Sequence, residues 1–276
     1  MRIDLHCHST HSDGSFPAAR VAEMAFAREV SLFCLSDHDT CDGYQATLAA
    51  YPKAIRGVEL SCVYEERTVH LLMYQRRSDQ ARWAVVEEAL KEQQEVRRTR
   101  VHLIAERLAD LGVTLDAADL VERHKGTIGR PHIAARLVET GAVGSQAEAF
   151  DRYLKDGGPG DVQVARLSLA QGLELGRAGG ACMSLAHPHV YGSRAESILR
   201  AHKPLGLQGL EVYYAQYKAK KRKNWSALAL ELGLLQTGGS DFHGQTLPQV
   251  PCLGVDMPDE LVKPLLDWLE IPGAEF

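Results

Sequence analysis

Short apolar runs that each end in histidines or carboxylates recur along this 276-residue chain, and they restrict its possible folds more than any other feature. One run spans residues 3–8 (IDLHCH), another spans 32–39 (LFCLSDHD), and the last spans 235–243 (LQTGGSDFH). Short apolar runs are typical of buried parallel strands, and polar side chains at the carboxyl ends of such strands collect at the mouth of a barrel. The sequence therefore predicts an α/β fold with its functional site at that mouth.

The composition is that of an ordinary globular protein, with 45% hydrophobic and 24% charged residues. The net charge of −5 gives no global basic field that would attract nucleic acid. The six cysteines form no C-x-x-C pair. The first residues lack the apolar region of a signal peptide, and no apolar run has the length of a membrane span. We therefore expect reduced thiols and a cytoplasmic protein.

Strand and helix patterns alternate at both ends of the chain but not in its middle. Strands are predicted at residues 2–7, 32–35, 54–60, 68–74, 182–186, 210–213 and 234–237. Helices are predicted near them at 16–28, 43–50, 195–202, 219–232 and 258–269. In the middle, Ser78 is expected to cap a long helix that ends near Asp110, and further helices are expected at 116–123, 131–139, 146–154 and 169–177. We interpret residues 76–178 as a helical insertion domain within a barrel domain of residues 1–75 and 179–276.

Histidine, aspartate and glutamate, which are common metal ligands, gather at the ends of the predicted strands. His6 and His8 share one face of a strand because side chains alternate with a period of two. The residues of this kind in or just beyond strands are His6, His8, Asp13, Asp37, His38, Glu59, His70, His187, Asp241 and His243. Any one of them alone would be an ordinary polar group at a strand end. Neutral imidazoles together with carboxylates form divalent-metal sites, so the set predicts a metal-dependent hydrolase.

Glu59 ends an apolar strand, where an isolated carboxylate would be costly to bury. It is therefore expected to be paired or bound to metal, and it could bridge two cations. His70 lies between apolar residues and would alone be interpreted as a core histidine. Beside Glu59 on the next strand, we interpret His70 as a ligand.

A possible anion site lies at residues 129–132 (GRPH), in the predicted insertion. Pro131 suits the first turn of a helix, and helix N-termini bind anions. Arg130 could grip a phosphate with two hydrogen bonds, with His132 beside it. The alternative is an ordinary helix start with an exposed arginine.

One dense basic run occupies residues 218–223 (KAKKRK). The favoured interpretation is a solvated helix face. The run follows Tyr213, Tyr214 and Tyr217, so a role in stacking on RNA bases and binding RNA phosphates is the alternative.

These segments together resemble those of the PHP (polymerase and histidinol phosphatase) superfamily over most of the chain. The resemblance is carried by the H-x-H of residues 6–8 and by residues 36–40 (SDHDT), 57–59 (GVE), 186–188 (AHP) and 240–243 (SDFH). Residues 11–15 (HSDGS) and 129–132 are similar to a bacterial subgroup that acts on nucleoside 3′,5′-bisphosphates, some members of which trim short RNA from its 5′ end. The resemblance implies a distorted (β/α)7 barrel of PHP type with a helical insertion domain.

The resemblance also implies two to three divalent metal ions. One would be held by His6, His8, Glu59 and Asp241, a second by Glu59, His70 and His187, and a third by Asp13, His38 and His243. Asp13 stands where several relatives have histidine, and this harder ligand favours manganese, with zinc, iron and magnesium as alternatives.

The chemistry implied is hydrolysis of a phosphate monoester, because bound metals lower the pKa of water and neutralise phosphate oxygens. Asp37 or His189 could orient groups or move protons, and Asp37 equally fits a partner that holds a metal ligand in one tautomer. We expect removal of the 3′-phosphate of pAp to give AMP, with 5′-3′ trimming of short RNA as a further activity. No membrane or obligate protein partner is expected.

Three alternatives remain open from the sequence. The first is a histidinol-phosphate phosphatase, which would need an acidic substrate pocket in place of a second cationic one. The second is an amidohydrolase or deaminase, since such barrels also begin with H-x-H, although no metal-bridging lysine is evident. The third is a metal-dependent RNA-binding module without catalysis.

Overall fold

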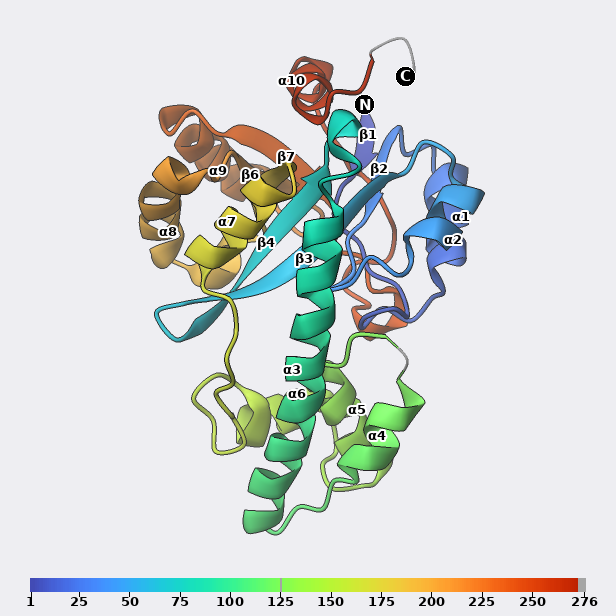
Figure 1. The fold of residues 1–276 in the computed structure, drawn as a ribbon, viewed down its shortest axis with the longest axis vertical. Coiled ribbons are helices and arrows are strands. Elements are labelled where there is room, and N and C mark those ends of the chain that lie inside the picture. The colour runs from blue at the N-terminus through green and yellow to red at the C-terminus, as the bar shows by residue number, and fades with distance from the viewer. Residues whose placement is uncertain (125, 273–276) are drawn as a thin grey trace.

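The computed structural model describes residues 1–124 and 126–272, and its strands form one sheet that curves into a nearly closed barrel (Figure 1). The sheet order is β7-β6-β5-β4-β3-β2-β1-β8. The strands are β1 (Arg2–Asp4), β2 (Leu32–Leu35), β3 (Ile55–Tyr64), β4 (Arg67–Gln75), β5 (Ala181–Leu185), β6 (Gly209–Tyr214), β7 (Leu235–Gly239) and β8 (Val255–Asp256). The seven strands expected from the sequence are thereby confirmed, and β8 was missed because two residues show no alternation.

Strand pairing departs from a regular parallel barrel in its middle. β1, β2 and β3 pair in parallel, as do β5, β6 and β7. β4 is antiparallel to both β3 and β5, and β8 is antiparallel to β1. The expectation of parallel strands is wrong for β4, because only Glu65 and Glu66 separate it from β3 and a parallel crossover needs a dozen or more residues.

Backbone hydrogen bonds at the carboxyl ends of β1 and β7 bring these two strands together. The Leu5 amide donates to the carbonyl of Gly238 at 3.0 Å, and the Asp241 amide donates to the carbonyl of His6 at 2.7 Å. The His8 amide then donates to the carbonyl of Phe242 at 2.9 Å. These bonds fix the H-x-H segment beside the D-x-H segment, although the 232 residues from 9 to 240 separate them in the chain.

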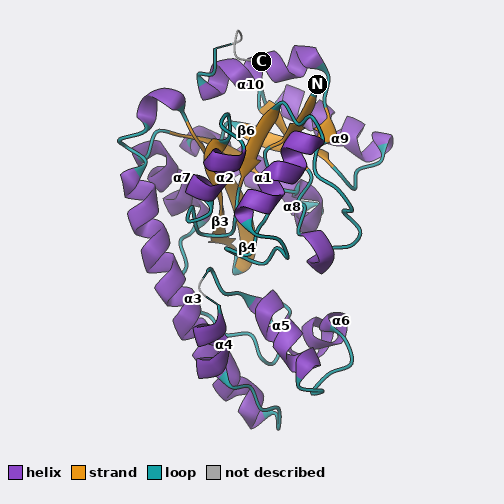
Figure 2. Ribbon diagram, turned by 90° about the vertical axis from the view of Figure 1, so that its right-hand side faces the viewer, coloured by secondary structure: helices purple, strands orange, loops and turns teal. Residues whose placement is uncertain are grey.

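Helices cover the outside of the sheet (Figure 2). Around the barrel they are α1 (Ala18–Ala27), α2 (Tyr44–Ala50), α7 (Leu169–Ala178), α8 (Arg194–His202), α9 (Ala219–Glu231) and α10 (Asp259–Leu269), with the short turns η1 (Arg77–Asp79), η3 (Pro188–Tyr191), η4 (Lys203–Leu205) and η5 (Gly244–Thr246). α1 shows why such helices form here, since Ala18, Val21, Ala22 and Ala25 make one buried stripe.

The chain between β4 and β5 carries helices and no strand within its described residues. It contains α3 (Ala84–Asp110), α4 (Ala117–Arg123), α5 (Arg130–Glu139), α6 (Gln146–Ala149) and the π-helical turn η2 (Phe150–Leu154) before α7. The predicted start of the long helix at Ser78 is wrong, because α3 begins six residues later. The Ser78 hydroxyl instead donates to the carboxylate of Glu270.

α3 runs through two apolar cores. Val86 and Leu90 pack in the barrel core, whereas Val101, Ile104 and Leu108 pack in a separate cluster formed by residues 101–162. This second cluster underlies the lobe that projects below the sheet in Figures 1 and 2. The domain boundaries at 76 and 178 stay a prediction, and packing assigns the first turns of α3 and all of α7 to the barrel side.

The described helices include none with both the length and the apolar character of a membrane span.

Gly239 at the end of β7 should not tolerate a side chain. A Cβ there would lie 2.3 Å from the Cβ of His6 and 2.6 Å from its amide nitrogen. Gly239→Ala should lower the free energy of unfolding by about 1–3 kcal/mol, as overpacking in a core does. Denaturant unfolding measures it, with Gly144→Ala as the control, because the nearest atom there is a flexible Glu148 carboxylate oxygen at 3.3 Å. Equal stability of the two variants would contradict the close contact.

Candidate metal centre

The structure brings together all of the side chains predicted as metal ligands. They come from the ends of different strands, which the barrel directs to one place. His6 and His8 follow β1, Asp13 lies in the next loop, His38 follows β2, Glu59 lies in β3, His70 lies in β4, His187 follows β5, and Asp241 and His243 follow β7. Their role as ligands stays a prediction, but their convergence is a feature of the fold.

Glu59 stands at the centre of this group, fully buried. Its Oε2 atom lies 3.1 Å from a ring nitrogen of each of three histidines: His6, His8 and His38. Its Oε1 atom lies 2.8 Å from His70 Nδ1 and 3.0 Å from His187 Nε2. The two oxygens thus face different sets of imidazoles, and a carboxylate placed in this way could bridge two cations.

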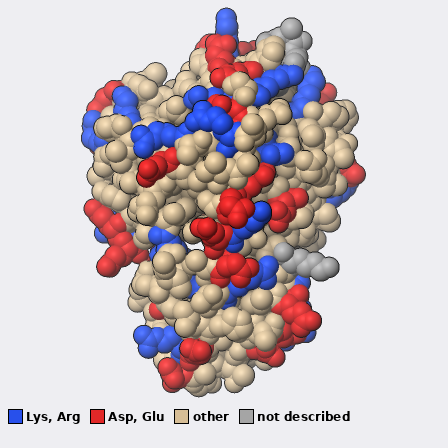
Figure 3. Space-filling view, in the orientation of Figure 1, with Lys and Arg blue, Asp and Glu red and all other residues tan. Residues whose placement is uncertain are grey.

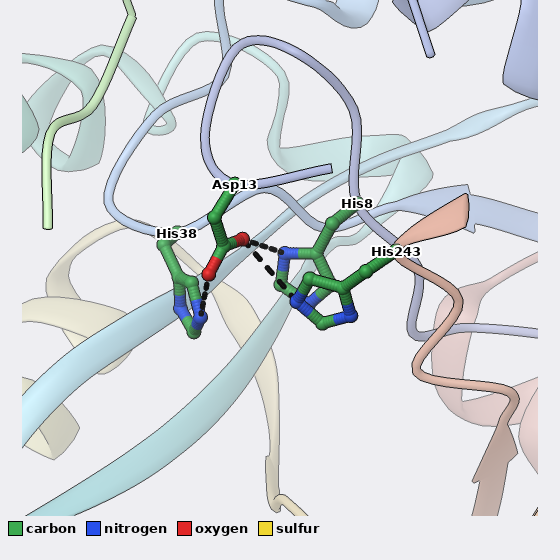
Figure 4. A group of neighbouring side chains, drawn as sticks. All are labelled: His8, Asp13, His38 and His243. Atoms are coloured by element: carbon green, nitrogen blue, oxygen red, sulfur yellow. Dashed lines mark ion pairs between the residues drawn. The ribbon is translucent and has the colours of Figure 1, made fainter. Parts of the chain in front are cut away.

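Three sets of donor atoms are close enough to share an ion. They are His6, His8, Glu59 and Asp241; His38, Glu59 and His70; and His8, Asp13, His38 and His243. In the last set the Asp13 carboxylate lies between the rings, with Oδ1 3.2 Å from His243 Nε2 and Oδ2 3.7 Å from His38 Nε2 (Figure 4). His187 lies beside the second set, with Nε2 3.1 Å from His70 Nδ1.

Buried polar atoms without a hydrogen-bond partner concentrate at this point. They include His6 Nε2, His8 Nε2, Asp13 Oδ1, His38 Nδ1 and Glu59 Oε2. Leaving such atoms unsatisfied costs about 1–3 kcal/mol each, and a divalent cation would satisfy them together. The donor set therefore fits a divalent metal.

The carboxylates of the centre are held in their ionised form. Burial raises the pKa of Glu59, but the charges of His6, His38 and His70 outweigh burial and hold that pKa well below its usual range. Burial also raises the pKa of Asp241, but the charges of His6 and His243 outweigh burial and hold that pKa below its usual range. Ionised carboxylates are the form that binds metal.

Glu211 supports the centre, and the sequence analysis missed it. Its buried carboxylate accepts a hydrogen bond from His6 Nδ1 at 2.9 Å and from the His187 amide at 2.6 Å. A carboxylate only accepts, so the Nδ1 atom of His6 carries a proton, and a metal ion would bind at Nε2. The signal was present in the sequence, since Glu211 interrupts an apolar strand just as Glu59 does.

Asp37, predicted to be catalytic, lies behind the predicted metal ligands. It accepts hydrogen bonds from the Ser9 amide at 2.7 Å and from the hydroxyls of Ser9 and Ser12 at 2.6 Å. The Ser12 hydroxyl lies 3.4 Å from His8 Nδ1. These contacts favour the alternative of a positioning role, in which Asp37 fixes the loop that carries Asp13.

His189, the other predicted catalytic residue, lies at the edge of the centre. Its Nδ1 atom is 2.9 Å from the Tyr217 hydroxyl, and its ring centroid is 6.3 Å from that of His187. Burial lowers the pKa of His189 to about 4, and His187 and Lys221 act in the same direction. A proton-transfer role for His189 stays a prediction.

A cavity of about 190 Å³ opens beside the centre, between the barrel and the helical lobe. Asp13, His38 and His70 line its barrel side. Four arginines line it from α3, α5 and the segment before α7: Arg97, Arg100, Arg130 and Arg166. Sequence reasoning found only Arg130, because the other three share no local motif and meet only in the folded chain.

The two residues predicted to bind phosphate are placed differently. Arg130 lines the cavity, where its guanidinium donates to Asp156 Oδ1 at 2.6 Å and to the carbonyl of Leu154 at 2.9 Å. His132 has both ring nitrogens in use, since Nε2 donates to the Ser12 carbonyl at 2.9 Å and Nδ1 accepts from the Gly129 amide at 3.1 Å. These bonds favour a role for His132 in tying α5 to the Asp13 loop.

Arg97 makes a second link between lobe and barrel. Its Nε atom donates to Oδ2 of Asp39 at 2.6 Å, and Asp39 directly follows His38 in the chain. Its other nitrogens donate to Ser61 Oγ at 2.7 Å and to the Ile128 carbonyl at 3.2 Å. Arg97 therefore connects α3, the segment before α5 and the His38 loop.

Comparison with known proteins finds relatives along most of the chain, although no family model matches it. The chain is 33% identical over 259 residues to a 3′,5′-nucleoside bisphosphate phosphatase of Chromobacterium violaceum, covering 87% of each protein. It is 30% identical over 251 residues to a 5′-3′ exoribonuclease of Haemophilus influenzae, covering 88% of the chain and 90% of that protein. The solved structure of an amidohydrolase from Chromobacterium violaceum, with bound sulfate and no metal, is similar over all of both chains at 27% identity and a TM-score of 0.84.

Removal of His8 should weaken metal binding, because its ring belongs to two of the three donor sets. Manganese should raise the melting temperature of the wild-type protein by several degrees, since a ligand at 100 times its Kd stabilises by about 2.7 kcal/mol. His8→Ala should lose this rise and lower the metal content after gel filtration. His102→Ala, on an exposed face of α3, is the matched control and should behave as wild type. Equal metal content in the His8 and His102 variants would contradict the assignment.

Proposed function

Because the chain belongs to the PHP superfamily and is a metal-dependent phosphoesterase, we propose that it removes the 3′-phosphate of nucleoside 3′,5′-bisphosphates and converts pAp to AMP. One observation carries this proposal: four arginines line the same cavity as three residues of the donor cluster, Asp13, His38 and His70. A substrate with two phosphates would place one at the metals and the other among the guanidinium groups. A relative named for this activity supports the same substrate class.

We assign the metal ligands in three sets. They are His6, His8, Glu59 and Asp241; Glu59, His70 and His187; and Asp13, His38 and His243. Two to three divalent ions held there would polarise the phosphate and activate water. Asp13 adds an oxygen donor to the third set, so we propose manganese as the preferred ion.

The arginines would recognise the second phosphate. Burial and the nearby cations Arg130 and Arg166 together lower the pKa of Arg100 to about 10, and burial has the largest effect. Crowded cations of this kind are stabilised by an anion between them. Arg130 offers the planar fork that pairs with phosphate oxygens, and its bond to Asp156 holds that fork at the cavity wall.

The rest of the cavity wall suits a nucleoside. Val101, Ile104, Ile133 and Phe150 line it between the arginines. An apolar wall with a few polar groups at its ends is typical of small-molecule sites. We infer that the nucleoside of pAp spans from the arginines to the metal-binding residues.

The same site would accept the 5′ end of an RNA chain. One nucleoside separates the two phosphates of pAp, and one nucleoside separates successive phosphates of RNA. Hydrolysis breaks the bond between phosphorus and the 3′ oxygen in both substrates, with water supplying the new oxygen. We therefore propose 5′-3′ trimming of short RNA as a second activity, and a relative named as an exoribonuclease supports it.

The remaining sequence alternatives fit the cavity less well. Arginines would repel the amino group of histidinol phosphate. A deaminase-type centre would use a bridging lysine, whereas we assign the bridging position to Glu59, which belongs to two of the three donor sets. The six cysteines are unpaired, which supports the proposal of a reducing, cytoplasmic setting.

Manganese-loaded protein should release AMP and phosphate from pAp, with little release of phosphate from histidinol phosphate. Chromatography of the products measures both, and a 5′-phosphorylated oligoribonucleotide in parallel should yield mononucleotides. His8→Ala should abolish these activities and His102→Ala should keep them. Preferred hydrolysis of histidinol phosphate, or release of ammonia from an amide substrate, would contradict the proposal.

Arg130→Ala should raise the KM for pAp by about 10- to 100-fold, because a hydrogen bond to a charged group contributes about 1.5–3 kcal/mol. The KM for an aryl phosphate, which lacks the second phosphate, should stay the same. Steady-state kinetics on both substrates tests this, with Arg152→Ala as the control, since Arg152 pairs with Glu148 on an exposed face. Equal effects on both substrates would remove Arg130 from phosphate recognition.

A further inference from the structure

Basic residues gather where β6 leads into α9, at a position that does not stabilise the helix. Lys218 precedes α9, and the first turns of the helix carry Lys220, Lys221, Arg222 and Lys223. The first turn contains no acidic residue. Positive charge at a helix N-terminus opposes the helix dipole and costs about 0.3–1 kcal/mol per residue. Helix stability therefore does not account for this run.

The four lysines also lack acidic partners. Each is exposed, and within the described part of the chain none has a carboxylate within 4.0 Å. Several basic groups elsewhere on the surface pair with neighbouring acids, as Arg200 does with Glu196. The face shown in Figure 3 likewise has both signs of charge interspersed. The run at the start of α9 is thus an unusual concentration of one sign in a chain of net charge −5.

Two tyrosines connect this run to the metal centre. Lys221 Nζ lies 5.3 Å from the centroid of the Tyr217 ring, which lies 5.0 Å from the ring of Tyr214. The Tyr214 hydroxyl donates to Asp241 Oδ2 at 2.8 Å. The basic residues therefore begin at the edge of the centre, and none of them lines the arginine cavity.

The tyrosines themselves are not platforms for bases. Tyr213, Tyr214 and Tyr217 are all buried, with exposed fractions of 8%, 3% and 5%. Arg222 covers the Tyr213 ring with its guanidinium carbon 4.9 Å from the centroid. The stacking role considered from the sequence is therefore wrong, and the exposed lysines remain as the groups that can meet a ligand.

We propose that the exposed lysines of the α9 basic run, Lys218, Lys220, Lys221 and Lys223, bind the phosphates of single-stranded RNA that follow the nucleotide being removed. This inference rests on the proposed function. The 5′-phosphate enters the arginine cavity, the next phosphate lies at the metal-binding residues, and the strand continues over α9. A bisphosphate such as pAp ends at the centre and does not reach the run.

The test compares a 5′-phosphorylated decaribonucleotide with pAp on the manganese-loaded enzyme. Lys220→Glu/Lys223→Glu should lower kcat/KM for the decamer by about tenfold or more and leave pAp within about twofold. The slope of log kcat/KM against log salt should become shallower by about 1.4, because each phosphate contact to a single strand contributes about 0.7. Lys203→Glu/Lys263→Glu, which makes the same charge change at exposed positions outside the run, should leave both substrates unaffected.

Each other outcome overturns the inference. Unchanged decamer kinetics, or an equal loss on both substrates, would remove the run from RNA binding. An enzyme that cleaves pAp but not the decamer would overturn the RNA proposal and leave the bisphosphate proposal standing. Only failure to cleave either substrate would overturn both.

Discussion

The buried carboxylate of Glu59 is the group on which the arrangement of the metal centre depends. An isolated charge in a protein interior is costly, and it persists only where opposite charges or metal ions surround it. Histidines that follow β1, β2 and β5, and one within β4, meet its two oxygens at 2.8–3.1 Å. The barrel therefore has to close between β1 and β7, since this closure carries His6 and His8 to the same point as Asp241.

The sequence predicted that these side chains converge, because each of them follows or interrupts an apolar run. His6, His38 and Asp241 each stand at the end of a strand, and the ends of parallel strands meet at one mouth. Arg97, Arg100 and Arg166 left no such pattern, because they lie far apart in the chain and only lobe packing brings them together. The roles of Asp37 and His132 depended on contacts with Ser9 and Ser12, and residue type alone does not reveal such contacts.

The failures in the fold have equally local causes. Ser78 has the side chain of a helix cap, but its hydroxyl is taken by Glu270 from the far end of the chain. The pairing direction of β4 was set by a two-residue turn, which no periodicity of apolar residues records. Tertiary contacts override local preference in the first case, and turn length decides the topology in the second.

The cavity is built from two parts of the chain that differ in what they contribute. The barrel contributes every donor of the three candidate metal sets, and the arginines come from residues 97–166. Links such as Arg97 to Asp39 hold the two parts in register. Evolution could therefore exchange the substrate by changing the lobe alone, while the hydrolytic apparatus is inherited intact. Such a division would let one barrel serve many phosphoesters.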